Sequence, residues 1–384
     1  MFLFQQKICY NSHISTYLLN ERIKMKPSYL LIAGLLTTVT YGANASHFYA
    51  NAISMNNIAT IQDSILHTAM HTFDRVPAAN LGDKKTMMPP TPEKSINELY
   101  GKLPIYGTMS IYGEYEEYEF AGRSGGDGKK PMLKNLQFIW QHYSDDAKLN
   151  NFGRADSRYD LAMVGITGGR MEFFDSITGW ATYAGFIDGK QSTSALQIDQ
   201  RGGYAGIFSR FNLKHFNLSA TINGGVLTND ADFALGSDNY TNMWAGAAAN
   251  ASINIILDDT FSLQPGVQIG YTWIESDSYV SATGNSVSNS DLGVFEVAPT
   301  LHAIKHIGSG WFGTAHVRYV TMMTDGGDLS VNSVKFETLE SDNFAEYGLS
   351  LEKTVGRLNL SGTLVRRDGG RDGWGGGLNV KYIF

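Results

Sequence analysis

The stretch Phe261-Ser-Leu-Gln-Pro-Gly-Val-Gln-Ile-Gly-Tyr-Thr-Trp273 has an apolar residue at every odd position and a small or polar residue at every even position. Successive side chains of a β-strand point to opposite faces, so this alternation predicts a strand with one apolar face and one polar face. Strands of globular proteins average about five to six residues. A tilted strand needs about 9–11 residues to cross a bilayer, and the length of this stretch therefore favours a strand that spans a membrane.

The same alternation recurs along the chain after about residue 135. Residues 216–226 and 247–255 repeat it, with apolar residues at every second position. Segments of this kind lie at about 136–143, 158–169, 176–187, 199–211, 216–227, 241–256, 261–274, 291–304, 311–322, 343–353, 357–365 and 374–384. Together they predict an all-β fold, a twelve-stranded antiparallel transmembrane β-barrel over residues 136–384.

The connections between these segments alternate between long and short. The long ones are 144–157, 188–198, 228–240, 275–290, 323–342 and 366–373, and the short ones are 170–175, 212–215, 257–260, 305–310 and 354–356. In an up-and-down outer-membrane barrel, one rim carries tight periplasmic turns and the other carries longer external loops. A soluble β-sandwich has no reason to alternate in this way, so the connections favour the barrel.

The polar faces of the strands favour an enclosed interior over a surface in water. They consist mostly of Asn, Ser, Thr, Gln and Gly, whereas a soluble surface carries many Lys, Glu, Arg and Asp. Aromatic residues tend to end the apolar faces, as interfacial girdles do in membrane barrels; these are Phe261, Tyr271, Trp273, Trp374 and Phe384. In a bilayer such a sheet must close, because an open edge has no water to satisfy its hydrogen bonds.

The composition of the chain excludes several other classes of protein. There are 30 Lys+Arg against 37 Asp+Glu, which gives a net charge of −7, and no basic run is present, so nucleic acid is not an expected partner. With 17% charged and 12% aromatic residues, the chain does not resemble a disordered protein. The longest apolar run, residues 30–39, is shorter than the roughly 20 residues of a membrane-spanning helix.

Residues 22–45 predict a secretory signal peptide. A basic start precedes an apolar stretch at residues 29–39, and Ala43 and Ala45 form a small-x-small cleavage site. The residues before Met25 are then an extended n-region or a mis-assigned start.

These features predict three parts of the chain. Residues 1–45 contain the signal peptide, residues 46–135 form a short passenger or linker, and residues 136–384 form the barrel. The single cysteine, Cys9, lies in the part that is removed, so the mature chain has no disulfide to stabilise it.

A helix is predicted at about residues 55–75. Its apolar stripe follows spacings of three and four and consists of Ile58, Ile61, Ile65, Ala69 and Phe73. Gln62, Asp63 and Thr68 lie on the other face. The pattern therefore predicts an amphipathic helix in front of the barrel.

The last segment carries a further signal. Leu378, Val380, Tyr382 and Phe384 share one face of the final predicted strand, and Phe384 is the last residue. This arrangement resembles the C-terminal signal of bacterial outer-membrane proteins, which the barrel-assembly machinery recognises. The resemblance implies that these residues direct assembly.

The chain over about residues 136–384 resembles the translocator domain of type V autotransporters. The matching stretches are Asp160–Arg170, Gly202–Gly206, Pro265–Tyr271 and the closing strand. The resemblance implies about twelve strands, with an amphipathic helix that threads the pore. It also implies export through the inner membrane, a location in the bacterial outer membrane, and contact with lipid, lipopolysaccharide, periplasmic chaperones and the assembly machinery.

One feature departs from the family pattern. An autotransporter normally carries a passenger of several hundred residues, whereas only residues 46–135 are available here. We therefore expect a monomeric, polar-lined pore with a helix plug and a vestigial passenger. The alternatives are a passive channel, or a surface adhesin that binds through the long connections 275–290 and 323–342.

The sequence offers little evidence for catalysis or cofactor binding. His67 and His71 have the spacing of a zinc pair on a helix, but the Glu of a metalloprotease signature is absent. His302 and His306 repeat the spacing at the end of a strand. We expect no catalytic residue, no metal site and no cofactor, with an outer-membrane hydrolase that uses His142 or His316 as the less favoured alternative.

The arginines offer two interpretations. Lumenal arginines would set the ion preference of a channel, and arginines at strand ends would lie at the lipid headgroups. The second interpretation is preferred for the set Arg154, Arg158, Arg170, Arg201, Arg210 and Arg318.

Overall fold

A computed structural model describes residues 47–73, 133–150, 153–168, 177–213, 216–336, 340 and 342–384. The signal peptide, its cleavage site at Ala43 and Ala45, and most of the predicted passenger lie outside the described residues. The three-part division of the chain therefore stays a prediction.

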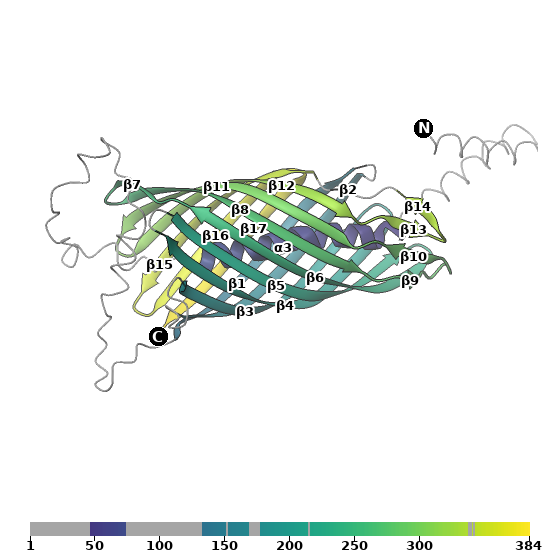
Figure 1. The fold of residues 1–384 in the computed structure, drawn as a ribbon, viewed down its shortest axis with the longest axis horizontal. Helices are drawn as coiled ribbons and strands as arrows, with labels where there is room; N and C mark the ends of the chain where they lie inside the picture. The colour runs from purple at the N-terminus through teal and green to yellow at the C-terminus, as the bar shows by residue number, and fades with distance from the viewer. Residues whose placement is uncertain are drawn as a thin grey trace, which may run out of the picture. The chain divides into compact units, whose positions relative to one another are not determined.

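Twelve antiparallel strands form a closed barrel. They are β1 (Leu133–Leu149), β2 (Gly153–Gly168), β3 (Ile177–Ser192), β4 (Leu196–Leu213), β5 (Phe216–Phe233), β6 (Gly236–Ser252), β8 (Phe261–Ser276), β11 (Leu292–Gly308), β12 (Trp311–Gly326), β15 (Phe344–Val355), β16 (Leu358–Gly369) and β17 (Arg371–Ile383). Each pairs with the next along the chain, and β1 pairs with β17 from Asn135↔Ile383 to Ala147↔Arg371 (Figure 1). A short strand, β7 (Ile255–Asp258), pairs with the start of β8. The predicted fold class and strand order are confirmed.

Most of the predicted long connections are wrong. At four of them the strands continue as paired hairpins. The first strand of each hairpin ends at Leu149, Ser192, Phe233 or Gly369, and the next begins at Gly153, Leu196, Gly236 or Arg371. The apolar alternation in the sequence marks contact with lipid, and it ends where the membrane band ends. Backbone pairing does not need lipid, so the strands extend beyond that band.

The other two long connections contain further strands. Residues 277–291 carry β9 (Tyr279–Val280) and β10 (Ser286–Asn289), and residues 327–343 carry β13 (Leu329–Val331) and β14 (Val334–Phe336). These four strands form one small sheet, which we call the rim sheet, in the order β14-β13-β10-β9. It lies at the right-hand end of the barrel in Figure 1.

The two faces of the barrel wall differ in chemistry. Along β2 and β6, exposed and buried residues alternate. The outer surface carries many exposed large apolar side chains, such as Ile222 at 59% and Leu349 at 65%. The inner face buries polar side chains such as Gln137, Gln200 and Asn242. The outer surface therefore suits lipid and the inner face suits a polar interior.

The helix α3 (Ala50–Phe73) lies inside the barrel, and η1 (His47–Tyr49) precedes it (Figure 1). Near its N-terminus, Asn51 bonds to Ser276, which ends β8 next to the rim sheet. At its C-terminus, Phe73 packs against Tyr183 of β3, with ring centroids 5.5 Å apart. The helix therefore runs along the barrel from the rim-sheet end towards the opposite rim.

Burial of α3 is more complete than the sequence predicts. The predicted apolar stripe is in the core, as Ile58, Ile61, Ile65 and Ala69 are at most 1% exposed and Phe73 is 8% exposed. The opposite face is buried as well, with Gln62 at 0% and Asp63 at 1%. A helix enclosed by a barrel has no side that faces solvent, so both the apolar and the polar face of the predicted helix are buried. Among the residues that the structure describes, no helix is long and apolar enough to cross a membrane.

Candidate functional site

A buried salt bridge in the lumen joins the helix to the barrel wall. Arg318 of β12 donates from Nη1 and Nη2 to the two carboxylate oxygens of Asp63 of α3, both at 2.7 Å. The same guanidinium donates from Nε to Glu346 of β15 at 2.8 Å. Both Arg318 and Asp63 side chains are fully buried. Such a charge is stable in an interior only when it is paired, so this contact holds α3 at one position along the wall.

Arg367 of β16 extends the network towards the rim-sheet end. Its guanidinium donates to Glu346 at 2.9 Å and to Asp145 of β1 at 3.0 Å. It also donates to the hydroxyls of Tyr159 and Ser64, both at 2.8 Å. Because Ser64 belongs to α3, this arginine also connects three wall strands with the helix.

Arg371 of β17 completes the series. It donates to Asp145 at 3.1 Å, and to the side-chain oxygen of Asn57 and the backbone oxygen of Asn56 at 3.4 Å each. The three arginines therefore alternate with Asp63, Glu346 and Asp145 along one side of the lumen. Each of the three arginines is 1% exposed or less. The buried charges of this series therefore compensate one another in pairs.

An uncharged chain of amides lies on another side of the helix. Asn57 donates to Gln200 of β4 at 2.7 Å, and Gln200 donates to Asn229 of β5 at 2.8 Å. Asn229 donates to Asn242 of β6 at 2.9 Å, and Asn242 donates back to Asn51 of the helix at 3.0 Å. The chain leaves the helix, crosses three strands and returns to the helix. It aligns α3 with β4, β5 and β6.

A close approach between helix and wall occurs at Gln62. Trp244 Nε1 donates to Gln62 Oε1 at 3.0 Å, and Gln62 Nε2 donates to Asn223. Gly246 lies beside this side chain, and a methyl group at that position would overlap Gln62 Nε2. The glycine therefore makes room for the helix.

The sequence-predicted assembly residues lie together on β17. Leu378, Val380 and Tyr382 are exposed on the outer face, at 58%, 38% and 38%, and Phe384 at the chain end is 58% exposed. The rings of Tyr382 and Phe384 meet edge to face at 5.5 Å between centroids. Their predicted role in assembly stays a prediction.

The sequence suggested two histidine pairs, His67 with His71 and His302 with His306, and the structure groups these residues differently. His67 and His71 of α3 lie near His302 of β11 and His316 of β12. His306, the predicted partner of His302, instead stacks on Phe312. Among the residues that the structure describes, His67, His316 and Glu346 have ligand atoms within 4.8 Å of one another, close enough to hold a metal ion.

The residues of the hydrolase alternative do not meet. His142 of β1 is 44% exposed and pairs with Asp160 across the strand at 3.2 Å, whereas His316 lies in the lumen with a side chain 7% exposed. They therefore belong to different places.

The arginine interpretation needs one correction. Arg154 and Arg201 are exposed and pair with Asp146 at 3.7 Å and Asp188 at 3.0 Å, as surface arginines do. Arg318 does not lie at a headgroup, because it is buried against Asp63. The sequence does not carry enough information to predict this, since the two residues are far apart along the chain.

Several solved structures of autotransporter barrels are similar to this fold. The translocator domain of the autotransporter NalP from Neisseria meningitidis aligns with a TM-score of 0.54 at 16% identity, over 67% of this chain and 91% of that chain. The transport unit of AIDA-I from Escherichia coli aligns with a TM-score of 0.52 at 15% identity, over 72% of this chain and 96% of that chain. The β domain of the Bordetella autotransporter BrkA aligns with a TM-score of 0.52 at 12% identity, over 66% of this chain and 100% of that chain.

The chain has the fold of an autotransporter translocator domain. The resemblance noted in the sequence is thus confirmed at the level of the fold. No protein-family model and no curated protein matches the sequence. The translocator fold and the apolar outer surface agree with the predicted location in a bacterial outer membrane.

Proposed function

We propose that this chain is an outer-membrane barrel of the translocator type whose own helix α3 closes the pore, and that residues 46–135, which include this helix, are a vestigial passenger. The observation that supports it best is the buried pair of Asp63 and Arg318, which joins the helix to the wall inside the lumen. A helix that only rested in the lumen would not need a buried charge. The pair gives α3 one seated position, as a plug requires.

The surroundings of the barrel follow from its surfaces. The exposed apolar side chains of the outer face would contact lipid and lipopolysaccharide. The exposed side chains of Leu378, Val380, Tyr382 and Phe384 would be accessible to the assembly machinery. Periplasmic chaperones would carry the chain there. We propose that the chain works as a monomer and without catalysis.

The plug is tested by single-channel conductance in planar lipid bilayers. We expect the full chain to remain closed and Asp63→Ala to open frequently, because the variant leaves Arg318 buried without this carboxylate. Asp188→Ala is the matched control, since it removes an exposed partner of Arg201.

Two results would contradict the plug. One is steady conductance through the full chain. The other is a closed Asp63→Ala variant whose heat-resistant band on an unboiled gel shows that it has folded.

The rim sheet supports a second function, attachment to a surface. Two connections far apart in the sequence assemble into this sheet around a core of Val287, Leu329 and Val331, against which Phe48 and Tyr49 pack. An ordered sheet at one rim gives a binding surface that separate loops would not. Replacing residues 279–289 by a short Gly-Ser linker should abolish attachment of cells to a host surface, while the unboiled barrel band is retained. Unchanged attachment would exclude the rim sheet as the adhesive part.

The position of the vestigial passenger is tested separately. A peptide tag placed directly before His47 should be removed by protease added to whole cells, because α3 begins at the rim-sheet end. A tag that is cleaved only after the outer membrane is opened would place this end in the periplasm.

A further inference from the structure

Four histidines form a closed ring of imidazoles between the helix and the wall. His67 and His71 come from successive turns of α3. His302 of β11 and His316 of β12 are directly paired across two strands. Neighbouring ring centroids are 4.2 Å apart for His67 and His71, 4.6 Å for His71 and His302, 5.5 Å for His302 and His316, and 5.8 Å for His316 and His67.

These spacings fit imidazoles arranged around one metal ion. A Zn–N bond of about 2.0–2.1 Å puts each ring centroid about 3.2 Å from the metal. Adjacent centroids are then about 4.5 Å apart in a square arrangement and about 5.2 Å apart in a tetrahedral one. The four observed separations lie on both sides of these values, and ligand atoms of His67 and His316 lie within 4.8 Å of each other.

The wall is shaped for the rings. Gly348 of β15 pairs with His316, and a methyl group at Gly348 would overlap the imidazole of His316. A cavity of about 80 Å³ is lined by all four histidines. This cavity is therefore large enough to admit water beside the rings.

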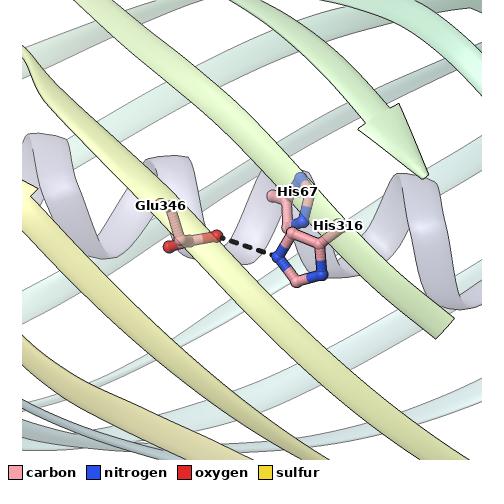
Figure 2. Close-up of side chains that lie close together, drawn as sticks. All are labelled: His67, His316 and Glu346. Atoms are coloured by element: carbon pink, nitrogen blue, oxygen red, sulfur yellow. Dashed lines mark ion pairs between the residues drawn. The ribbon is translucent and has the colours of Figure 1, made fainter. Parts of the chain in front are cut away.

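Glu346 takes a supporting position. Its Oε1 lies 3.6 Å from His316 Nε2 (Figure 2), and ligand atoms of His67, His316 and Glu346 lie within 4.8 Å of one another. The carboxylate is already bonded to Arg318 and Arg367. Glu346 therefore lies beside the ring with its carboxylate held by two arginines, and the four ligands of the site are the imidazoles.

Further observations indicate a ligand for the ring. Nδ1 of His67 is buried, and it has no hydrogen-bond partner among the residues that the structure describes. Imidazole suits zinc, copper and nickel, whereas calcium and magnesium need oxygen ligands.

We propose that His67, His71, His302 and His316 bind one divalent transition-metal ion, such as Zn²⁺. This proposal differs from the expectation drawn from the sequence, which was that the chain has no metal site. It does not depend on the proposed function. Because two ligands belong to α3 and two to the wall, the bound ion fastens the helix to β11 and β12.

The test is a calorimetric titration of the full chain in detergent with ZnCl₂, on protein purified without a polyhistidine tag. We expect one ion per chain, and a loss of affinity of about 100-fold or more in His302→Ala and in His316→Ala. His142→Ala and His306→Ala are matched controls outside the ring, and we expect them to bind as the unaltered chain does. The unboiled barrel band shows which variants are folded.

A second measurement identifies the ligands directly. Co²⁺ bound by several imidazoles gives visible absorption that the hydrated ion lacks, and this absorption should be lost in His302→Ala and kept in His306→Ala. No binding by the unaltered chain, or equal affinity in the ring variants and the controls, would overturn the proposal.

Discussion

Arg367 has the most varied surroundings of the lumenal residues described above. Besides its four hydrogen-bonded partners, its guanidinium carbon lies 4.2 Å from the ring centroid of Tyr143 and 5.4 Å from that of Phe344. Two carboxylates and two aromatic rings stabilise the positive charge in a place from which water is excluded. A lysine could not satisfy this set, because it lacks the planar fork of donors.

Removal of Arg367 should therefore lower the stability of the barrel strongly. In Arg367→Leu, Glu346 and Asp145 stay buried without this partner, and we expect a loss of about 3–5 kcal/mol in the free energy of unfolding. Urea titration of the purified chain measures the free energy of unfolding. The temperature at which the unboiled band is lost provides a second comparison of the variants. Arg201→Leu is the control, because Arg201 is 73% exposed and its ion pair contributes about 1 kcal/mol or less. Equal losses in both variants would show that the buried network does not stabilise the fold.

The close approach at Gly246 gives a prediction with an internal control. We expect Gly246→Ala to cost about 1–3 kcal/mol, because the new methyl group displaces Gln62 from Trp244 and Asn223. The addition of Gln62→Ala should recover part of this loss, since the smaller side chain leaves room for the methyl group. Gly362→Ala tests the general effect of alanine on a strand, as its methyl group would lie 3.7 Å from Leu378, an ordinary contact. Additive losses in the double variant would show that Gly246 is not needed for the seating of the helix.

At the scale of the elements, alternation in the sequence predicts the strands well and their ends poorly. Each of the twelve segments corresponds to a barrel strand, because alternation records which side chains face lipid. β1 continues to Leu149, beyond the predicted end at residue 143, because hydrogen bonds to β2 and β17 persist after the lipid contact ends. Sequence reasoning detects solvent and lipid contact, and it does not detect the extent of backbone pairing.

The lumenal site could not be predicted in the same way. The apolar stripe of α3 was recognised, but the partners of its polar residues come from strands that are distant in the sequence. Asp63 and Arg318 are 255 positions apart. Likewise, His71 has the spacing of a helical pair with His67, whereas its contact with His302 depends on the register of the helix inside the barrel. Pattern alone does not give that register.

The closing strand carries a prediction about assembly. Phe384 is 58% exposed, so its removal should cost the folded barrel little stability. If it acts as an assembly signal, deletion of Phe384 should leave the chain in the periplasm, degraded or aggregated. The same variant refolded in detergent should melt like the full chain.

Comparison of cell fractions with refolded protein separates a defect in assembly from a loss of stability. Val355→Ala, at the end of β15, provides a control for the loss of one exposed apolar side chain at a strand end. Normal insertion without Phe384 would exclude the assembly role, and a large loss of stability in detergent would make Phe384 a structural residue instead.

At the scale of the whole molecule, closure between β1 and β17 predicts the behaviour of a membrane barrel. The purified protein should need detergent to stay dispersed, and an unboiled sample should migrate faster on a gel than a boiled one, because the closed sheet resists unfolding by the detergent. Material that stays dispersed and compact in buffer without detergent would contradict the assignment of the apolar face to lipid.

The complete enclosure of α3 also affects how fast the helix can leave the lumen. A helix inside a closed barrel can leave only by moving along the barrel axis. A shift of one residue moves the helix by about 1.5 Å. Even that short step takes Asp63 away from Arg318 and Asn57 away from Gln200 together, so departure is all-or-none. If α3 is the plug proposed above, it should therefore stay seated throughout a conductance recording rather than move in and out of the lumen.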